Sequence, residues 1–354
     1  MQRTLSILLT LLLAAGLAYG IWSSAQQSRV VTVRGLIGSE KEAFFADPAV
    51  QERLKRQHKL KTEVIKAGSR EMVAADLAGY DFAFPSGTPS AEALRQRSGA
   101  SQLYDAFYTP LAVASWEPVA GVLEANGLSK EEGGVAWLDM RALLPVMTAG
   151  KRWSDLKGSA AYPSKRSLLI GTTDVRKSNS AALYLALVSY LLGGEQPPQA
   201  SEVPALTPQV SPLFLRQGYQ AGSSAGPFED YLALGAGKSP MVAVYESQYL
   251  EKARQKRLPA GSVLLYPSPT IFTKHMLVPL DDAGHRLGKA LSTDPELQRL
   301  AAQYGFRTPD AAIFSAEVAA TGKVVPANLV DLAQEPSQEV TNALIGAIEK
   351  QYPQ

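Results

Sequence analysis

Two different hydrophobic periods alternate along the first third of the chain. Residues 30–37, 61–67 and 80–84 are short runs rich in β-branched or aromatic residues, which is typical of strands. Runs with helical periodicity and polar starts separate them. Strands and helices that alternate in this way form a parallel sheet with right-handed crossovers. We therefore predict an α/β fold that begins with a βαβαβ unit.

Each of these three strands is predicted to run into a loop that carries a serine. The serines are Ser39, Ser69 and Ser86. The carboxyl ends of parallel strands meet at one edge of a sheet, where open α/β folds bind ligands, so we expect the three hydroxyl groups in one polar pocket. Ser39 with Glu42 also fits a capping box, and Ser69 starts a helix. Helix capping alone would therefore explain these two serines.

A further stretch of this kind lies at residues 168–192. Apolar residues 168–170 end in a glycine, a polar loop follows, and Ser178, Asn179 and Ser180 open a nearly all-apolar helical run. The start of a helix has unpaired N–H groups and a partial positive charge, which together bind an anion or another strong acceptor. An ordinary strand-to-helix turn in a core would show the same pattern, so both interpretations stay open.

Two long extended runs, residues 108–116 and 262–278, bracket the middle of the chain. With 354 residues, the chain is too long for one small core. We predict two lobes that are joined by these two crossing segments and separated by a cleft. Residues 26–112 and 267–354 would form lobe 1, and residues 113–266 would form lobe 2.

The N-terminus indicates export. Arg3 precedes an uncharged, leucine-rich run over residues 5–22, which is near the length of a membrane-spanning helix. Residues 1–25 are therefore expected to be a transmembrane anchor, or a signal peptide that is cleaved after residues 23–25. Either interpretation places the following body outside the cytoplasm, as a single-pass membrane protein or as a secreted periplasmic one.

Composition argues against several classes of site. The chain has no cysteine, which excludes disulfides, thiolate metal sites and a lipid-modified cysteine. The net charge of +2 gives no electrostatic case for nucleic-acid binding. The three histidines are widely spaced, so we predict no metal site and no cofactor.

The motif G-x-S-x-G at residues 222–226 raises the alternative of a serine hydrolase. Ser224 would be the nucleophile, with His275 or His285 downstream. A nucleophile elbow needs a strand before the serine and a helix directly after it. Here polar residues precede the motif and Pro227 follows it. We therefore predict that the chain is not an enzyme.

The organisation of residues 30–351 resembles that of the type 2 periplasmic solute-binding proteins, and the sulfate/molybdate/phosphate-like branch is the most similar. The segments that carry the resemblance are VRGLIGSEKEAFF, YDFAFPSG, YTPLAVASWEP, WSDL, DVRKSNSAALYLAL, SPMVAVYESQYL and VLLYPSPT. The resemblance implies two α/β lobes that close on a solute, with loops and helix starts of both lobes as ligands.

Carried over residue by residue, the resemblance implies a set of ligand-binding residues from both lobes. They are Gly38, Ser39, Ser69, Arg70, Ser86, Ser178, Asn179, Ser180, Tyr245 and Glu246. The solute is expected to be a small polar molecule or an oxyanion, because hydroxyl and N–H groups hold an anion without a formal countercharge.

The predicted function is thus that of an extracytoplasmic solute-binding protein, as a transport receptor or a sensor. Its partner would be a membrane permease or an envelope complex. The alternative is a membrane-anchored envelope interaction protein that has the same fold but no transport role.

Overall fold

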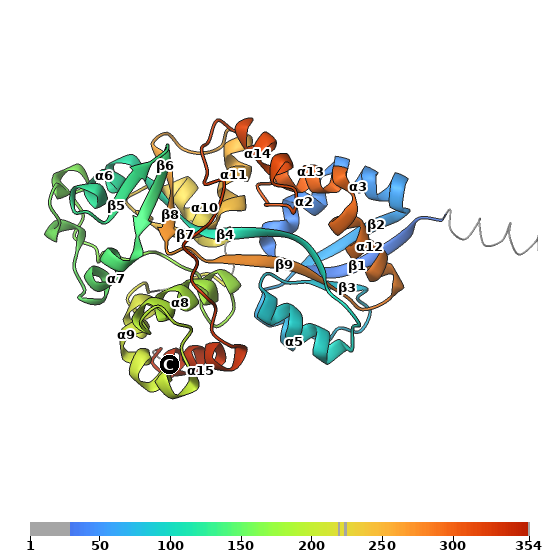
Figure 1. Cartoon of the computed structure of the whole chain (residues 1–354), viewed down its shortest axis with the longest axis horizontal. Coiled ribbons are helices and arrows are strands. Elements are labelled where there is room, and N and C mark those ends of the chain that lie inside the picture. Colours follow the sequence, from blue (N-terminus) through green and yellow to red (C-terminus); the bar gives the residue numbers. More distant parts are fainter. Residues whose placement is uncertain (1–28, 219, 223–224, 353–354) are drawn as a thin grey trace, which may run out of the picture.

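The computed structural model describes residues 29–218, 220–222 and 225–352. These residues form two α/β lobes that share one mixed sheet of nine strands (Figure 1). The strand order is β2-β1-β3-β9-β4-β8-β6-β5, and β7 pairs with β4 off this path. The predicted two-lobe α/β architecture is confirmed.

Lobe 1 lies on the right of Figure 1 and contains the N-terminal strands. Its strands are β1 (Val31–Ile37), β2 (Leu60–Lys66), β3 (Phe82–Phe84) and β9 (Phe272–Pro279). Its helices are η1 (Ser39–Lys41), α2 (Glu42–Ala46), α3 (Pro48–Arg53), η2 (Leu54–His58), α4 (Ser69–Ala74), α5 (Thr88–Ser98), α12 (Asp282–Thr293), α13 (Pro295–Gln303) and α14 (Ala311–Ala319). Strand β1 pairs in parallel with both β2 and β3, which confirms the predicted βαβαβ unit.

Lobe 2 has its own core, which is built around one buried helix. Its strands are β5 (Ser129–Glu132), β6 (Val135–Asp139), β7 (Val242–Tyr245) and β8 (Ser262–Ser268). Its helices are α6 (Glu117–Ala125), α7 (Met140–Thr148), η3 (Trp153–Asp155), η4 (Ser159–Ala161), α8 (Asn179–Leu192), η5 (Ala200–Glu202), α9 (Val203–Leu215), α10 (Ala225–Leu234), α11 (Glu246–Arg254) and α15 (Gln338–Glu349). Residues 180–189 of α8 are all buried, which explains why this helix is apolar on every side.

Strand β4 (Tyr104–Trp116) passes from one lobe into the other. Its first half pairs with β9, and its second half pairs with β7 and β8. The predicted crossing segments are therefore present as β4 and as the connection from β8 to β9. The run predicted over residues 262–278 is two strands, interrupted at residues 269–271.

The C-terminus differs from the predicted division, which placed residues 267–354 in lobe 1. After α14 the chain crosses back to lobe 2, where Thr270 N–H donates to the carbonyl of Asp331 (Figure 1). Helix α15 then packs on α8 and α9. It does so because one side of the helix is apolar, and Leu344 and Ile348 on that side are fully buried in the lobe 2 core. The lobes are thus joined by three crossings rather than the predicted two.

Local capping chemistry is confirmed at some predicted positions and absent at others. The side chains of Asp47 and Ser337 cap α3 and α15 as predicted. The predicted capping box at Ser39 is wrong, because Ser39 lies inside η1, at whose start no side chain caps. Residues 168–170 form no strand, and one bridge at Gly171 joins this segment to β7.

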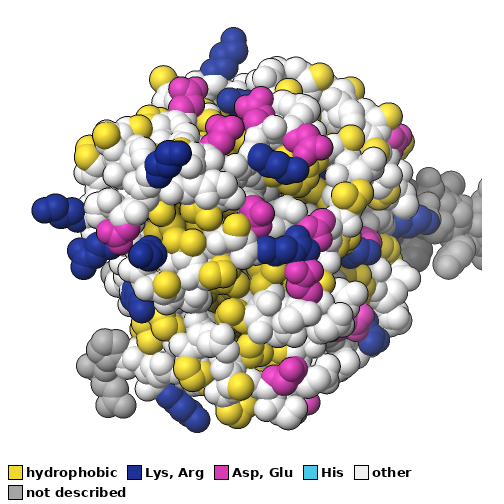
Figure 2. All heavy atoms as spheres, turned by 60° about the vertical axis from the view of Figure 1, so that its left-hand side comes forward, with side chains coloured by type: hydrophobic (Ala, Val, Ile, Leu, Met, Phe, Trp, Pro, Cys, Tyr) yellow, Lys and Arg dark blue, Asp and Glu magenta, His cyan; other side chains and the backbone are white. Residues whose placement is uncertain are grey.

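The surface carries both signs of charge. On the face shown in Figure 2, basic and acidic side chains are interspersed, in keeping with the net charge of +2. Within residues 29–218, 220–222 and 225–352, the structure contains no helix of the length and apolarity that a membrane crossing needs. The predicted anchor or signal peptide at residues 5–22 lies outside the described residues.

A buried ion pair joins α11 to the segment that follows α13. Arg307 donates to both carboxylate oxygens of Glu246, at 2.7 and 2.8 Å, and Tyr266 donates to the same carboxylate at 2.6 Å. The side chain of Glu246 is 0% exposed and that of Arg307 is 4% exposed. Arg307 also donates to the carbonyl of Pro326 at 2.8 Å. The carboxylate is thus fully occupied by groups of the protein itself.

We expect Glu246→Ala to destabilise the protein by about 3–5 kcal/mol, because it leaves a buried guanidinium without its counterion. Urea unfolding followed by circular dichroism measures this loss. The double variant Glu246→Leu/Arg307→Met, which removes both charges, should recover part of it. An unchanged unfolding midpoint in Glu246→Ala would show that the pair does not stabilise the fold.

Candidate functional site

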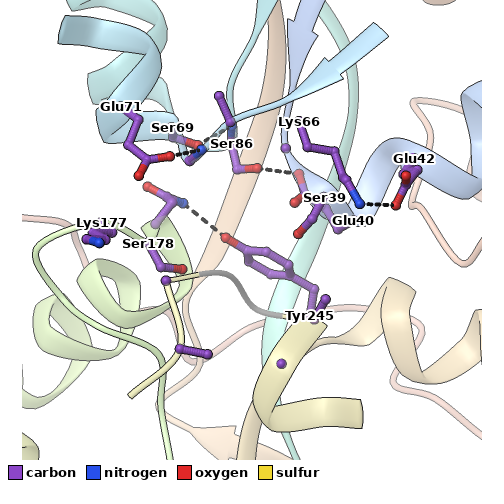
Figure 3. A pocket seen from close by; sticks show the side chains of 18 of the residues that line it. Ser39, Glu40, Glu42, Lys66, Ser69, Glu71, Ser86, Lys177, Ser178 and Tyr245 are labelled. Atoms are coloured by element: carbon purple, nitrogen blue, oxygen red, sulfur yellow. Dashed lines mark hydrogen bonds and ion pairs between the residues drawn. The ribbon is translucent and has the colours of Figure 1, made fainter. Parts of the chain in front are cut away.

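A cavity of about 420 Å³ lies between the two lobes. Lobe 1 lines it with the loops that follow β1, β2 and β3, and lobe 2 lines it with the start of α8, the start of α10 and the end of β7 (Figure 3). This is the edge at which parallel strands end, so the position of the cavity follows from the topology of the sheet. Its size is within the usual range for small-molecule sites.

Seven of the ten predicted ligand-binding residues line this cavity. They are Gly38, Ser39, Ser69, Ser86, Ser178, Asn179 and Tyr245. The three serine-bearing loops of lobe 1 therefore meet as the strand order requires. The hydroxyl of Ser69 accepts a hydrogen bond from the backbone N–H of Ser86 at 2.9 Å, which ties the second loop to the third.

Arg70, Ser180 and Glu246 do not line the cavity. Arg70 reaches across to lobe 2, where it donates to the side-chain oxygen of Asn342 at 2.9 Å. Ser180 is buried and its hydroxyl lies 3.0 Å from the hydroxyl of Thr173. Glu246 forms the ion pair described above. The structure thus gives these three side chains other contacts, and we leave them out of the proposed site.

A buried ammonium group lies directly behind the cavity wall. Lys41 is fully buried, and its Nζ donates to Glu40 Oε1, to Ser86 Oγ at 3.2 Å and to His275 Nδ1 at 2.9 Å. The same Nζ lies 4.9 Å from the centre of the Phe84 ring. These three acceptors use all three protons of the ammonium group. Because His275 accepts at Nδ1, the neutral imidazole carries its proton on Nε2.

The cluster keeps Glu40 ionised. Burial by itself would raise the pKa of Glu40, but the charge of Lys41 and the hydrogen bonds from Lys41 and Ser86 outweigh it and lower the pKa from 4.5 to about 2. Burial and the nearby charge of Lys41 lower the pKa of His275 well below 6.5, so the ring stays neutral. Ser86 donates to Glu40 at 2.6 Å, but a carboxylate with so low a pKa is too weak a base to activate a hydroxyl. Glu40 therefore does not activate Ser86 as a nucleophile.

The lobe 2 side of the cavity presents hydrogen-bond donors. Asn179 donates to the hydroxyl of Tyr245 at 3.2 Å. The hydroxyl of Ser178 lies 3.0 Å from that of Ser180, and no side chain of the described residues caps α8. The first N–H groups of this helix are therefore available to an acceptor.

The sequence analysis missed Glu40, Lys41 and His275. The sequence pattern places the first two inside a predicted capping box, although they lie in the same loop as Ser39. For His275 it offers only the roles of a partner of Ser224 or of a metal ligand. A signal was present in the placement of Glu40 and Lys41 directly after an apolar strand, at an edge that was already predicted to bind a solute.

The described residues do not test the alternative hydrolase. Ser224 lies outside the described residues. His285 lies on α12, where its Nδ1 is 3.1 Å from the hydroxyl of Tyr104, whereas His275 belongs to the Lys41 cluster. Among the described residues, no group of three or more potential metal ligands lies together.

Comparisons with known proteins connect the chain to others through its fold. No protein-family model matches the chain, and no curated protein matches it in sequence. The sulfate-binding protein SubI from Mycobacterium tuberculosis H37Rv is similar in structure, with a TM-score of 0.57 and 16% identity over 92% of this chain and 100% of that one. The periplasmic binding protein AfuA from Actinobacillus pleuropneumoniae has a TM-score of 0.56 and 14% identity over 90% and 97% of the two chains.

A periplasmic thiamin binding protein is also similar, with a TM-score of 0.52 and 11% identity over 91% of this chain and 96% of that chain. These proteins are named as binding proteins for different solutes, among them sulfate and thiamin, so the likeness concerns architecture and does not select a branch. The chain has the fold of the periplasmic solute-binding proteins.

Proposed function

We propose that the chain is an extracytoplasmic solute-binding protein whose two lobes close on one small polar solute. The observation that carries the proposal is the cavity between the lobes, which both lobes line with hydroxyl, amide and charged groups. Clefts of this kind, with a few convergent polar groups, are typical binding sites. The resemblance in fold to binding proteins for sulfate and thiamin supports the same role.

Direct contacts across the gap support closure of the lobes. Arg70 of lobe 1 donates to the carbonyl of Arg176 at 3.3 Å and to Asn342 at 2.9 Å, both in lobe 2. A Cβ atom on Gly68 would lie 2.7 Å from the carbonyl oxygen of Lys177, so the two backbones touch. Hinge closure of two lobes around a ligand is a common binding transition.

The cellular role follows from this proposal together with the N-terminal pattern. Residues 5–22 would hold the body at the outer side of the membrane or direct its export. In either case the closed form would be presented to a membrane permease, or to a sensor in an envelope complex.

The first prediction concerns the residues that bind the solute. We expect at least one compound in a panel of sulfate, phosphate, glucose, glucosamine, glycine, L-serine, ethanolamine and putrescine to raise the melting temperature at millimolar concentration, because a ligand that binds only the folded state stabilises it. Ser39→Ala/Ser178→Ala should abolish the shift, since each serine lines one side of the cavity. Differential scanning fluorimetry and calorimetric titration measure both effects.

The melting temperature of the double variant without added compound is the control, and it should stay close to that of the wild type. Unchanged affinity in the double variant would place the solute elsewhere. If no compound in the panel shifts the melting temperature of the wild type, the proposal of solute binding is contradicted.

The second prediction concerns closure. Gly68 has extended backbone angles of φ −65° and ψ 146°, so a side chain fits its backbone, but a side chain there would collide with Lys177 across the gap. We expect Gly68→Val to hold the lobes apart, to increase the radius of gyration in small-angle X-ray scattering, and to weaken binding of the compound identified above.

Gly346→Val is the matched control, because nothing lies within 4 Å of a Cβ atom at this position of α15. It should scatter like the wild type. A Gly68→Val protein with wild-type dimensions and affinity would rule out this contact as part of the closed state.

A further inference from the structure

The wall of the cavity is acidic rather than basic. Four glutamates and two lysines among the described residues line it. Together with the ammonium group of Lys41 behind the wall, the carboxylates are in excess by one. No arginine of the described residues is among the lining side chains. One of the lysines, Lys66, already pairs with Glu42 at 2.9 Å. A cavity of this charge does not attract an oxyanion by its long-range field.

Glu40 is the carboxylate that a bound solute would meet inside the cavity. Its side chain is 4% exposed, and it lies at the cavity wall between Ser86 and Tyr245 (Figure 3). Its Oε1 accepts from Lys41 and from Ser86. Its Oε2 receives no hydrogen bond from any residue in the described part of the chain. This oxygen therefore keeps its capacity to accept hydrogen bonds at the cavity wall.

The two groups that donate to Glu40 have no proton left for Oε2. Lys41 donates its three ammonium protons to Glu40 Oε1, Ser86 and His275. The hydroxyl of Ser86 donates its proton to Oε1 of Glu40. An ionised carboxylate accepts hydrogen bonds and cannot donate one, so a fully deprotonated oxyanion such as sulfate would meet it acceptor to acceptor. A solute that carries a hydrogen-bond donor would therefore complement Oε2.

We infer that the solute carries a primary ammonium group, which donates to Oε2 of Glu40, while its oxygen atoms face Ser178, Asn179 and the start of α8. This inference rests on the proposed function and names the substrate class of the same site. An ammonium ion fits the wall in two respects: it can donate a hydrogen bond to Oε2 of Glu40, and its positive charge offsets the excess of carboxylates. Charge-assisted hydrogen bonds of this type are shorter and stronger than neutral ones.

Matched pairs of probes test the inference on the wild-type protein. The pairs are glucosamine and glucose, ethanolamine and ethylene glycol, glycine and glycolate, and L-serine and glycerate; each differs by an ammonium group in place of a hydroxyl group. Putrescine, sulfate, phosphate and molybdate complete the set. In calorimetric titration we expect an ammonium compound to bind, and its hydroxyl counterpart to bind at least about tenfold more weakly.

A variant then assigns the contact to Glu40. Glu40→Gln/Lys41→Met removes both charges of the buried pair, so no unpaired ion remains in the core. We expect this double variant to bind the ammonium compound with an affinity at least about tenfold lower than that of the wild type. Glu63→Gln is the control, because this carboxylate is 50% exposed and lies outside the cavity. The comparison of matched probes on the wild type stands even where the double variant folds poorly.

The outcomes separate the inference from the proposed function. If an oxyanion or a neutral compound binds and no ammonium compound does, solute binding stands and the ammonium inference is overturned. Equal affinity of the wild type and the folded double variant for the ammonium compound overturns it as well. If no probe of any class binds, the proposed function falls together with the inference.

Discussion

The shared strand β4 is the constraint on which the two-lobe architecture depends. Residues 104–110 pair with β9 in lobe 1, and residues 113–116 pair with β8 in lobe 2. Breaking the buried backbone hydrogen bonds of a strand costs free energy, so each half of β4 is held to its own lobe. The lobe 2 pairing begins at Leu111, which pairs with Tyr245 of β7. The N–H of Leu111 also donates to the carbonyl of Ile271, at the interruption between β8 and β9.

The same arrangement explains why the cavity has a charged wall. The lobe 1 edge of the sheet brings together η1, the loop after β3, and β9, and these supply the three acceptors of Lys41. A buried ammonium group without acceptors would be strongly unfavourable, so the cluster holds the three segments in register. The hydrogen bonds of Lys41 hold Glu40 at the cavity wall, where the donors Lys41 and Ser86 both bond Oε1. The need of the buried Lys41 for acceptors thus also determines the position of Glu40 at the cavity wall.

Elements set by local chemistry were predictable from the sequence, and elements set by distant pairing were not. The βαβαβ unit follows from hydrophobic period, and the cap at Asp47 follows from the side chain and the proline after it. Seven of the predicted site residues meet because the strand-edge rule needs only topology. His275 joins Lys41 only because β9 enters the sheet beside β3, an antiparallel neighbour that no local pattern specifies. The apolar face of α15 likewise predicts that the helix is buried on one side, but it does not indicate on which lobe the helix packs.

Two glutamates show why residue type alone does not identify a ligand. Glu246 follows a strand end at the cavity, as the family resemblance requires, but Arg307 and Tyr266 occupy both of its oxygens. Glu40 has the same side chain at an equivalent edge, yet the donors from the described part of the chain reach only one of its oxygens. The difference is the number of donors that tertiary packing brings within reach. A solute can bind only to those acceptor atoms that donors within the protein do not already occupy. Which atoms these are depends on tertiary packing and therefore cannot be read from the residue type.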